Sequence, residues 1–145
     1  MRDIYHNTGD TILLEPQDLA HTNTLSAIID TVGFAGVDLK VIVSALTGVD
    51  GSNYLTIVAQ ESATTATGAF TTVAAGDLLG AFTVINSTSK DSLEQKVGYI
   101  GNKRYVRISL VYTGTTISAG VVGVIATVDS ASTAPVTAPA ITATT

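Results

Sequence analysis

The chain has 145 residues, of which 46% are hydrophobic and 13% charged, and its formal net charge is −5 at pH 7. Such a length supports one domain with a single core. The negative charge opposes binding to the phosphates of DNA or RNA, so we expect no nucleic-acid partner. No apolar run approaches the ~20 residues of a membrane-spanning helix, and we expect no membrane partner either.

The amino-terminal segment, MRDIYHNTGD, has no apolar stretch after Arg2, which is atypical of a secretory signal peptide. Residues 11–15 are a candidate strand that ends at Pro16, but the residues around it lack a periodic pattern. We therefore expect residues 1–22 to form an N-terminal arm. The sequence has no cysteine, which excludes disulfides and thiolate metal sites.

Two further segments alternate between apolar and polar residues, as strands with one buried face do. Residues 37–46 place Leu39, Val41 and Val43 on one face. Residues 53–62 follow after a turn that contains Asp50 and Gly51, and the simplest connection is a β-hairpin. Residues 68–73 and 80–85, which share the letters GAFT, are expected to form two shorter strands.

The stretch KVGYIGNKRYVRISLVYTG, residues 96–114, predicts a second hairpin. Gly101 and Asn102 form its turn, with glycine at the position that a type II′ turn prefers. The returning strand has a predicted core face of Val106, Ile108, Leu110 and Tyr112. Its other face, expected to meet solvent or a partner, carries Tyr105, Arg107, Ser109 and Val111.

Residues 119–128 form the last predicted strand, with one apolar face made of Val122, Val124, Ala126 and Val128. With about eight short strands separated by turn residues, the chain is predicted to be all-β. We expect a single-domain β-sandwich or jelly roll over residues 23–128 with extended terminal arms. From Asp129 the composition shifts to Thr, Ala and Pro, so residues 129–145 are expected to form a C-terminal arm or tail.

Candidate catalytic and metal-binding residues are scarce. The only histidines are His6 and His21, and no acidic residue is spaced from them as in a known hydrolase or zinc motif. No set of nucleophile, base and oxyanion donors can be assembled from the spacing of the residues. We therefore expect a protein that is not an enzyme and has no cofactor or metal.

Five of the seven Lys and Arg residues fall in one region: Lys90, Lys96, Lys103, Arg104 and Arg107. Three interpretations remain open, namely a solvated face, a contact with an acidic partner subunit, and a nucleic-acid or glycan surface. Arg107 lies between Tyr105 and Ser109 on one strand face. It is best suited to a charge-assisted contact, because a guanidinium group binds carboxylates bidentately and stacks on aromatic rings.

Three segments, MRDIYHN, DLLGAFTVI and KVGYIGNKRYVRISLVYTG, resemble a family of small proteins encoded in the head-gene region of tailed bacteriophages and prophages. The resemblance runs from Met1 to about Val136, and the third segment is its most specific part. The tail STAPVTAPAITATT extends past the end of those relatives. The resemblance implies a virion structural protein, most closely a capsid decoration or cement protein on the capsid exterior that assembles in the host cytoplasm.

The implied partners are the major capsid protein and further copies of this chain, as a homotrimer or homodimer. The partner-binding residues that we expect are Tyr5, Lys96, Tyr99, Lys103, Arg104, Tyr105 and Arg107. One alternative is a tail or head-completion protein. Another is a glycan- or receptor-binding module displayed on the virion, in which Tyr54, Tyr99 and Tyr105 form a stacking platform.

Overall fold

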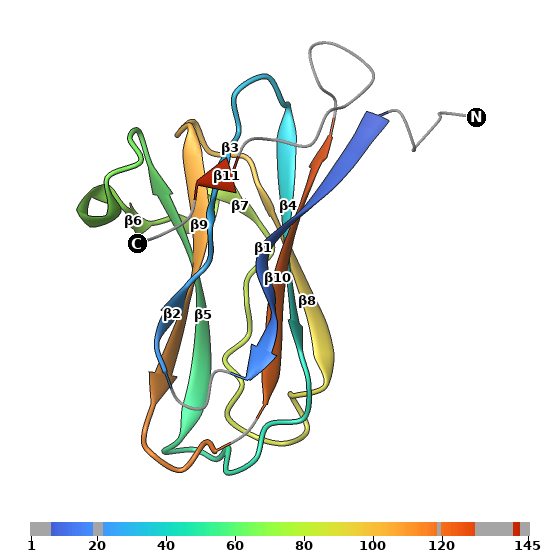
Figure 1. Cartoon of the computed structure of the whole chain (residues 1–145), viewed down its shortest axis with the longest axis vertical. Coiled ribbons are helices and arrows are strands. Elements are labelled where there is room, and N and C mark those ends of the chain that lie inside the picture. Colours follow the sequence, from blue (N-terminus) through green and yellow to red (C-terminus); the bar gives the residue numbers. More distant parts are fainter. Residues whose placement is uncertain (1–6, 19–21, 119, 130–140, 143–145) are drawn as a thin grey trace.

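The computed structural model describes residues 7–18, 22–118, 120–129 and 141–142 (Figure 1). They form two antiparallel sheets packed face to face as a β-sandwich, which confirms the predicted fold class. Among these residues no helix has the length and apolar character required to span a bilayer.

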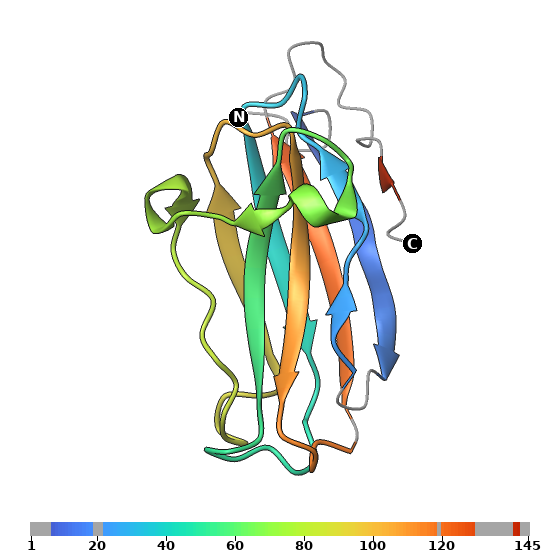
Figure 2. The ribbon, with the colours of Figure 1, turned by 90° about the vertical axis from the view of Figure 1, so that its left-hand side faces the viewer.

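The order of strands defines the two sheets. Sheet A runs β1 (Thr8–Asp18), β10 (Val121–Asp129), β4 (Gly36–Val43), β8 (Leu93–Tyr99) and β7 (Leu78–Leu79). Sheet B runs β11 (Ile141–Thr142), β3 (Ile28–Asp30), β9 (Tyr105–Thr113), β5 (Tyr54–Ser62) and β6 (Thr71–Thr72), and β2 (Thr24–Leu25) also pairs with β9. Two 3-10 helices, η1 (Thr67–Ala69) and η2 (Ala75–Asp77), flank β6. Figure 2 shows this green segment lying across the outer face of β5 and β9.

Eight of the strands are wound as a jelly roll. Strand β1 pairs with β10, β3 with β9, β4 with β8 and β5 with β6, all antiparallel. The chain is therefore a long antiparallel ribbon that is paired from its ends inward. The ribbon is wrapped so that its strands fall into two facing sheets.

The core lies between the sheets and is built from alternate residues of each long strand. The predicted apolar faces are confirmed, because Val41 in β4, Ile108 in β9 and Val124 in β10 are fully buried. Alternation places these side chains on the inner faces of the two sheets, where they pack against each other.

Both predicted hairpins are wrong. The first would pair β4 with β5 and the second β8 with β9, but in each case the two strands lie in different sheets. Strands β4 and β8 belong to sheet A, and β5 and β9 belong to sheet B. The segment after β4 buries Leu46 and Val49 in the core, so it closes one end of the sandwich and does not form a tight turn. After β8, Gly101 lacks the positive φ that a type II′ turn requires. Its backbone lies against the ring of Tyr99, where an added Cβ would come within 2.6 Å.

The expected N-terminal arm, residues 1–22, contains a complete strand of sheet A. Strand β1 pairs with β10 from Thr8 to Asp18 and buries Leu13. The sandwich therefore begins at Thr8, not at residue 23. Within the expected C-terminal arm, residues 129–145, strand β11 pairs with β3. Residues 1–6 and 130–140 lie outside the described residues.

The two GAFT segments have different structures. Residues 68–73 contain the end of η1 and the two residues of β6. Residues 80–85 form no strand, and Ile85 makes only an isolated bridge with Leu55 of β5. The expectation of two short strands is therefore confirmed for the first segment and wrong for the second.

Candidate functional site

Six of the seven expected partner-binding residues lie on β8, on β9 or in the connection between them. The seventh, Tyr5, lies outside the described residues, as do His6 and His21. The described part of the chain holds no group of three or more His, Asp or Glu side chains placed to bind a metal ion.

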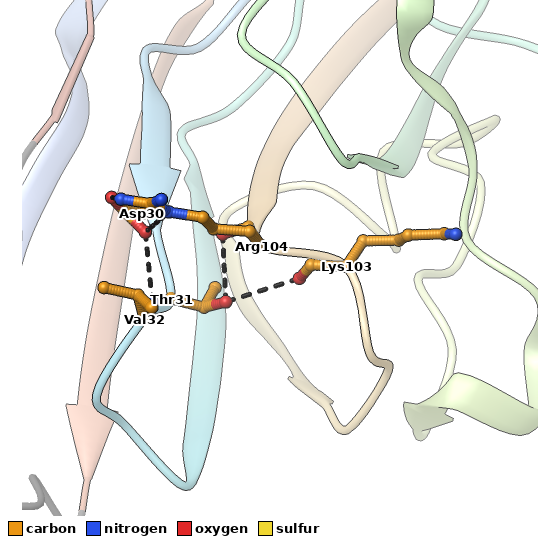
Figure 3. Close-up of polar contacts among 5 residues, drawn as sticks. All are labelled: Asp30, Thr31, Val32, Lys103 and Arg104. Atoms are coloured by element: carbon orange, nitrogen blue, oxygen red, sulfur yellow. Dashed lines mark hydrogen bonds and ion pairs between the residues drawn. The ribbon is translucent and has the colours of Figure 1, made fainter.

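Arg104 is held within the protein by a bidentate ion pair with Asp30 of β3 (Figure 3). Its Nε donates to Oδ1 at 2.9 Å and its Nη2 donates to Oδ2 at 2.7 Å. The hydrogen bond from Arg104 lowers the pKa of Asp30 below its ordinary value. The hydroxyl of Thr31 donates to the carbonyl of Arg104 at 2.9 Å and fastens the same two segments. Arg104 therefore ties the end of β3 to the β8–β9 connection.

Arg107 is 4% exposed, so the prediction that it faces solvent or a partner is wrong. Its Nε donates to Oε1 of Gln60 at 2.8 Å, and its Nη2 donates to the carbonyl of Thr67 at 3.2 Å. Its guanidinium group stacks on Phe70, 4.1 Å from the ring centroid. The segment around η1 and β6 thus covers this face of β9 at Arg107. Ser109 on the same face is also buried.

The lysines of the basic cluster do not converge on one surface. Lys96 of β8 lies 3.3 Å from Asp38 of β4, on the outer face of sheet A. Lys90 donates to the side-chain oxygen of Asn86 at 2.8 Å. Lys103 is exposed and makes no ion pair within the described ranges. The lysine side chains that are close in the sequence therefore do not form one positively charged surface in the structure.

Tyr99 is a core residue that joins the two sheets. It is 3% exposed, and its hydroxyl donates to Oε2 of Glu61 in β5 at 2.6 Å. The same oxygen accepts the backbone N–H of Lys103 at 2.9 Å. Burial and the hydrogen bond with Glu61 raise the pKa of Tyr99 above its ordinary value. This tyrosine fixes the β8–β9 connection and presents no face to a partner.

The tyrosine platform of the glycan-binding alternative is not assembled. Tyr54 and Tyr105 lie at opposite ends of sheet B, since Tyr54 pairs with Thr113 and Tyr105 pairs with Ser62. Tyr99 is buried between the sheets. Tyr105 is half-buried and has the guanidinium group of Arg104 5.1 Å from its ring centroid.

A hollow of about 220 Å³, which no sequence pattern predicted, opens at the end of sheet A. We call it the Gly36 hollow. Its lining combines the exposed apolar side chains of Leu79 and Ile100 with the carboxylates of Asp38 and Asp129. A Cβ atom added to Gly36 would meet no atom within 4 Å, so the missing side chain leaves this space open.

No sequence signal marks the Gly36 hollow, because its members come from separate segments of the chain. The register places Gly36 beside Asp129 and Asp38 beside Gly98. Only this pairing shows that two glycines and two acids fall next to each other on the outer face of the sheet.

Comparison of the chain with protein-family models and with curated proteins finds no match. The resemblance to phage head-region proteins therefore stays a prediction from the sequence.

Proposed function

We propose that this protein is a structural component of a tailed-phage virion, a decoration or cement protein that coats the capsid exterior and stabilises the shell of the major capsid protein. The resemblance of residues 96–114 to phage head-region proteins motivates this function. The jelly-roll sandwich suits the proposal, since viral capsid proteins use the same architecture. Fold alone assigns no function, so the proposal depends on how the chain attaches to its neighbours.

The observation that carries the proposal is the pairing of β11 with β3. Ile141 pairs with Ile29 and Thr142 with Ile28, so the end of the chain adds a strand to the margin of sheet B. The same backbone hydrogen bonds can join a terminal segment to the sheet edge of another subunit. Many copies on one lattice convert such short contacts into strong attachment.

The basic β8–β9 segment contributes less to this attachment than the sequence implies. Arg104 and Arg107 are engaged within the chain, and Lys96 is paired with Asp38. The proposed contacts with the major capsid protein and with further copies, as a homotrimer or homodimer, therefore rest on the chain ends and on exposed apolar side chains. The proposal includes neither nucleic acid, membrane nor cofactor, and no enzymatic step.

The test compares virions that contain the protein with virions of a deletion phage that lacks it. We expect the deleted heads to release DNA at lower temperature, and gel densitometry of complete virions to give hundreds of copies per particle. Equal heat resistance of the two particles would remove the cement function. A count of a few copies would instead favour the tail or head-completion alternative.

A variant of β11 tests the attachment itself. Ile141→Pro removes the backbone N–H of a residue that pairs with Ile29. We expect lower occupancy on the heads with an unchanged folded domain. The matched control is Ile141→Thr, which changes the side chain and keeps the backbone donor. Equal occupancy of the two variants would show that strand addition by β11 is not the contact.

A further inference from the structure

The Gly36 hollow lies at the end of sheet A where β1 and β4 begin and β10 and β8 end. Thr8 pairs with Asp129, Asp129 pairs with Gly36, and Asp38 pairs with Gly98. Four of these positions line the hollow with short side chains or none: Thr8, Gly36, Asp38 and Asp129. The space is open above Gly36, whereas the side chains of Leu79 and Asp38 lie over Gly98. The space of about 220 Å³ is large enough for one or two side chains of another polypeptide segment.

The chemistry of the hollow fits an apolar side chain next to a cation. Leu79 is 62% exposed and Ile100 is 51% exposed, and both line it. Asp38 forms an ion pair with Lys96, in which Oδ2 lies 3.3 Å from Nζ. Asp129 makes no ion pair with the described residues. Its carboxylate, near the apolar side chains that line the hollow, therefore has no cationic partner among the described residues. An arginine or lysine would complement it.

We propose that the Gly36 hollow is the docking site for the amino-terminal residues of a second copy of this chain. The segment MRDIYHN supplies the required chemistry, with one cation and apolar side chains two and three positions later. Arg2 of one copy meets Asp129 of the other. Ile4 and Tyr5 of the same segment cover the exposed side chain of Leu79.

The position of the segment in the chain favours a second copy over the same copy. The amino-terminal residues lead into β1 at Thr8, which itself lines the hollow. To enter its own hollow, the chain would have to reverse direction directly before this strand. Six residues span up to about 20 Å, which suffices to cross to a copy related by a two-fold axis. Two hollows then exchange two segments in one self-complementary interface.

The decisive experiment exchanges charges between the two sides of the contact. Full-length Arg2→Asp and full-length Asp129→Lys are each studied by sedimentation velocity, alone and mixed in equal amounts. We expect the wild type to dimerise and each variant alone to dissociate at least tenfold more readily, because like charges then meet at both contacts.

Mixing the two variants should restore association. In the mixed dimer, the aspartate introduced at position 2 of one copy meets the lysine introduced at position 129 of the other. At the second contact, the unchanged Arg2 meets the unchanged Asp129. Opposite charges therefore face each other at both contacts, as they do in the wild-type dimer.

The outcome of mixing separates this proposal from its rivals. If the segment docks within its own copy, mixing the two variants restores nothing, and the proposal is overturned. It is equally overturned if the wild type is monomeric at all concentrations. Binding of a different protein would likewise leave the isolated chain monomeric.

A second pair of variants tests the cavity without changing charge. Gly36→Leu fills the hollow, and we expect it to weaken association at least tenfold. Gly51→Leu is the matched control, since a Cβ atom there also meets nothing within 4 Å and the residue lies in the β4–β5 connection, away from the hollow. Equal association of these two variants would exclude the hollow as the docking site. This inference deepens the self-association included in the proposed function, but it is tested on isolated protein, so its failure leaves capsid binding open.

Discussion

The hydroxyl of Tyr99 in sheet A donates a 2.6 Å hydrogen bond to the carboxylate of Glu61 in sheet B. Both residues are at least nine-tenths buried. The contact crosses the sandwich close to the β8–β9 connection, and the backbone N–H of Lys103 donates to the same hydroxyl. One side chain therefore satisfies a buried acid and a connecting backbone group together.

Tyr99→Phe should lower the free energy of unfolding by about 1–3 kcal/mol, because it leaves the Glu61 carboxylate and the Lys103 N–H without this partner. Tyr112→Phe is the matched control. The Tyr112 hydroxyl is buried with no hydrogen-bond partner in the part of the chain that the structure describes, and burial raises the pKa of Tyr112 to about 12. Its removal should cost about 0.5 kcal/mol or less. Urea denaturation of both variants measures the difference, and equal losses would contradict this account.

The Asp30–Arg104 ion pair should make part of the stability depend on acid pH. Hydrogen bonding to Arg104 depresses the folded-state pKa of Asp30 below 3.8, so the unfolded chain takes up the proton first as the pH falls. The contribution is complete above the unfolded-state pKa and is lost as the pH falls through the lower folded-state pKa. In Asp30→Asn it is absent.

Urea denaturation between about pH 2.5 and 7 measures this contribution. The difference in unfolding free energy between the wild type and Asp30→Asn should stay constant above about pH 5 and shrink below 3.8. The difference in unfolding free energy between the wild type and Arg104→Met should shrink in the same pH range, since this variant removes the other partner of the ion pair. A difference that stays constant over the whole range would show that the pair does not titrate with folding.

Alternation within strands predicted the buried faces correctly, because a side chain's direction depends only on its position along its own strand. Val106, Ile108 and Leu110 are all fully buried, as expected. Strand neighbours could not be predicted in the same way. In a jelly roll the partner of a strand lies far away in the chain, so β4 pairs with β10 and β8 while the adjacent β5 lies in the other sheet.

The candidate site was harder to predict than the fold. The polar face of β9 is typical of a solvent-exposed surface, yet the segment around Phe70 folds over it and buries Arg107. The sequence places Gly101 in a hairpin turn, whereas its requirement for glycine comes from the Tyr99 ring. In both cases the deciding contact joins residues whose proximity depends on tertiary packing and leaves no local pattern.

Arg107 should stabilise the protein mainly through packing and not through its charge. Its Nη1 is buried without a hydrogen-bond partner among the described residues, and burial lowers the pKa of the guanidinium group. Arg107→Met keeps an apolar stem against Phe70 and removes the buried charge, so we expect a loss below about 1 kcal/mol. Arg107→Ala should cost about 2–4 kcal/mol because it leaves a cavity. Thermal and urea denaturation distinguish the two, and equal losses would show that the charge itself is required.

Gly48 should tolerate no side chain, for two independent reasons. Its φ of +83° lies in the left-handed region, and an added Cβ would come within 2.1 Å of the carbonyl oxygen of Thr116. The backbone of the β9–β10 connection, which contains Thr116, would have to move. Gly48→Ala should therefore lower the free energy of unfolding by about 2 kcal/mol or more. Gly51→Ala lies three positions later in the same connection, has open space around its Cβ, and should change stability by less than about 0.5 kcal/mol. If urea denaturation gave the two variants equal stability, the close approach of the β4–β5 connection to Thr116 would be wrong.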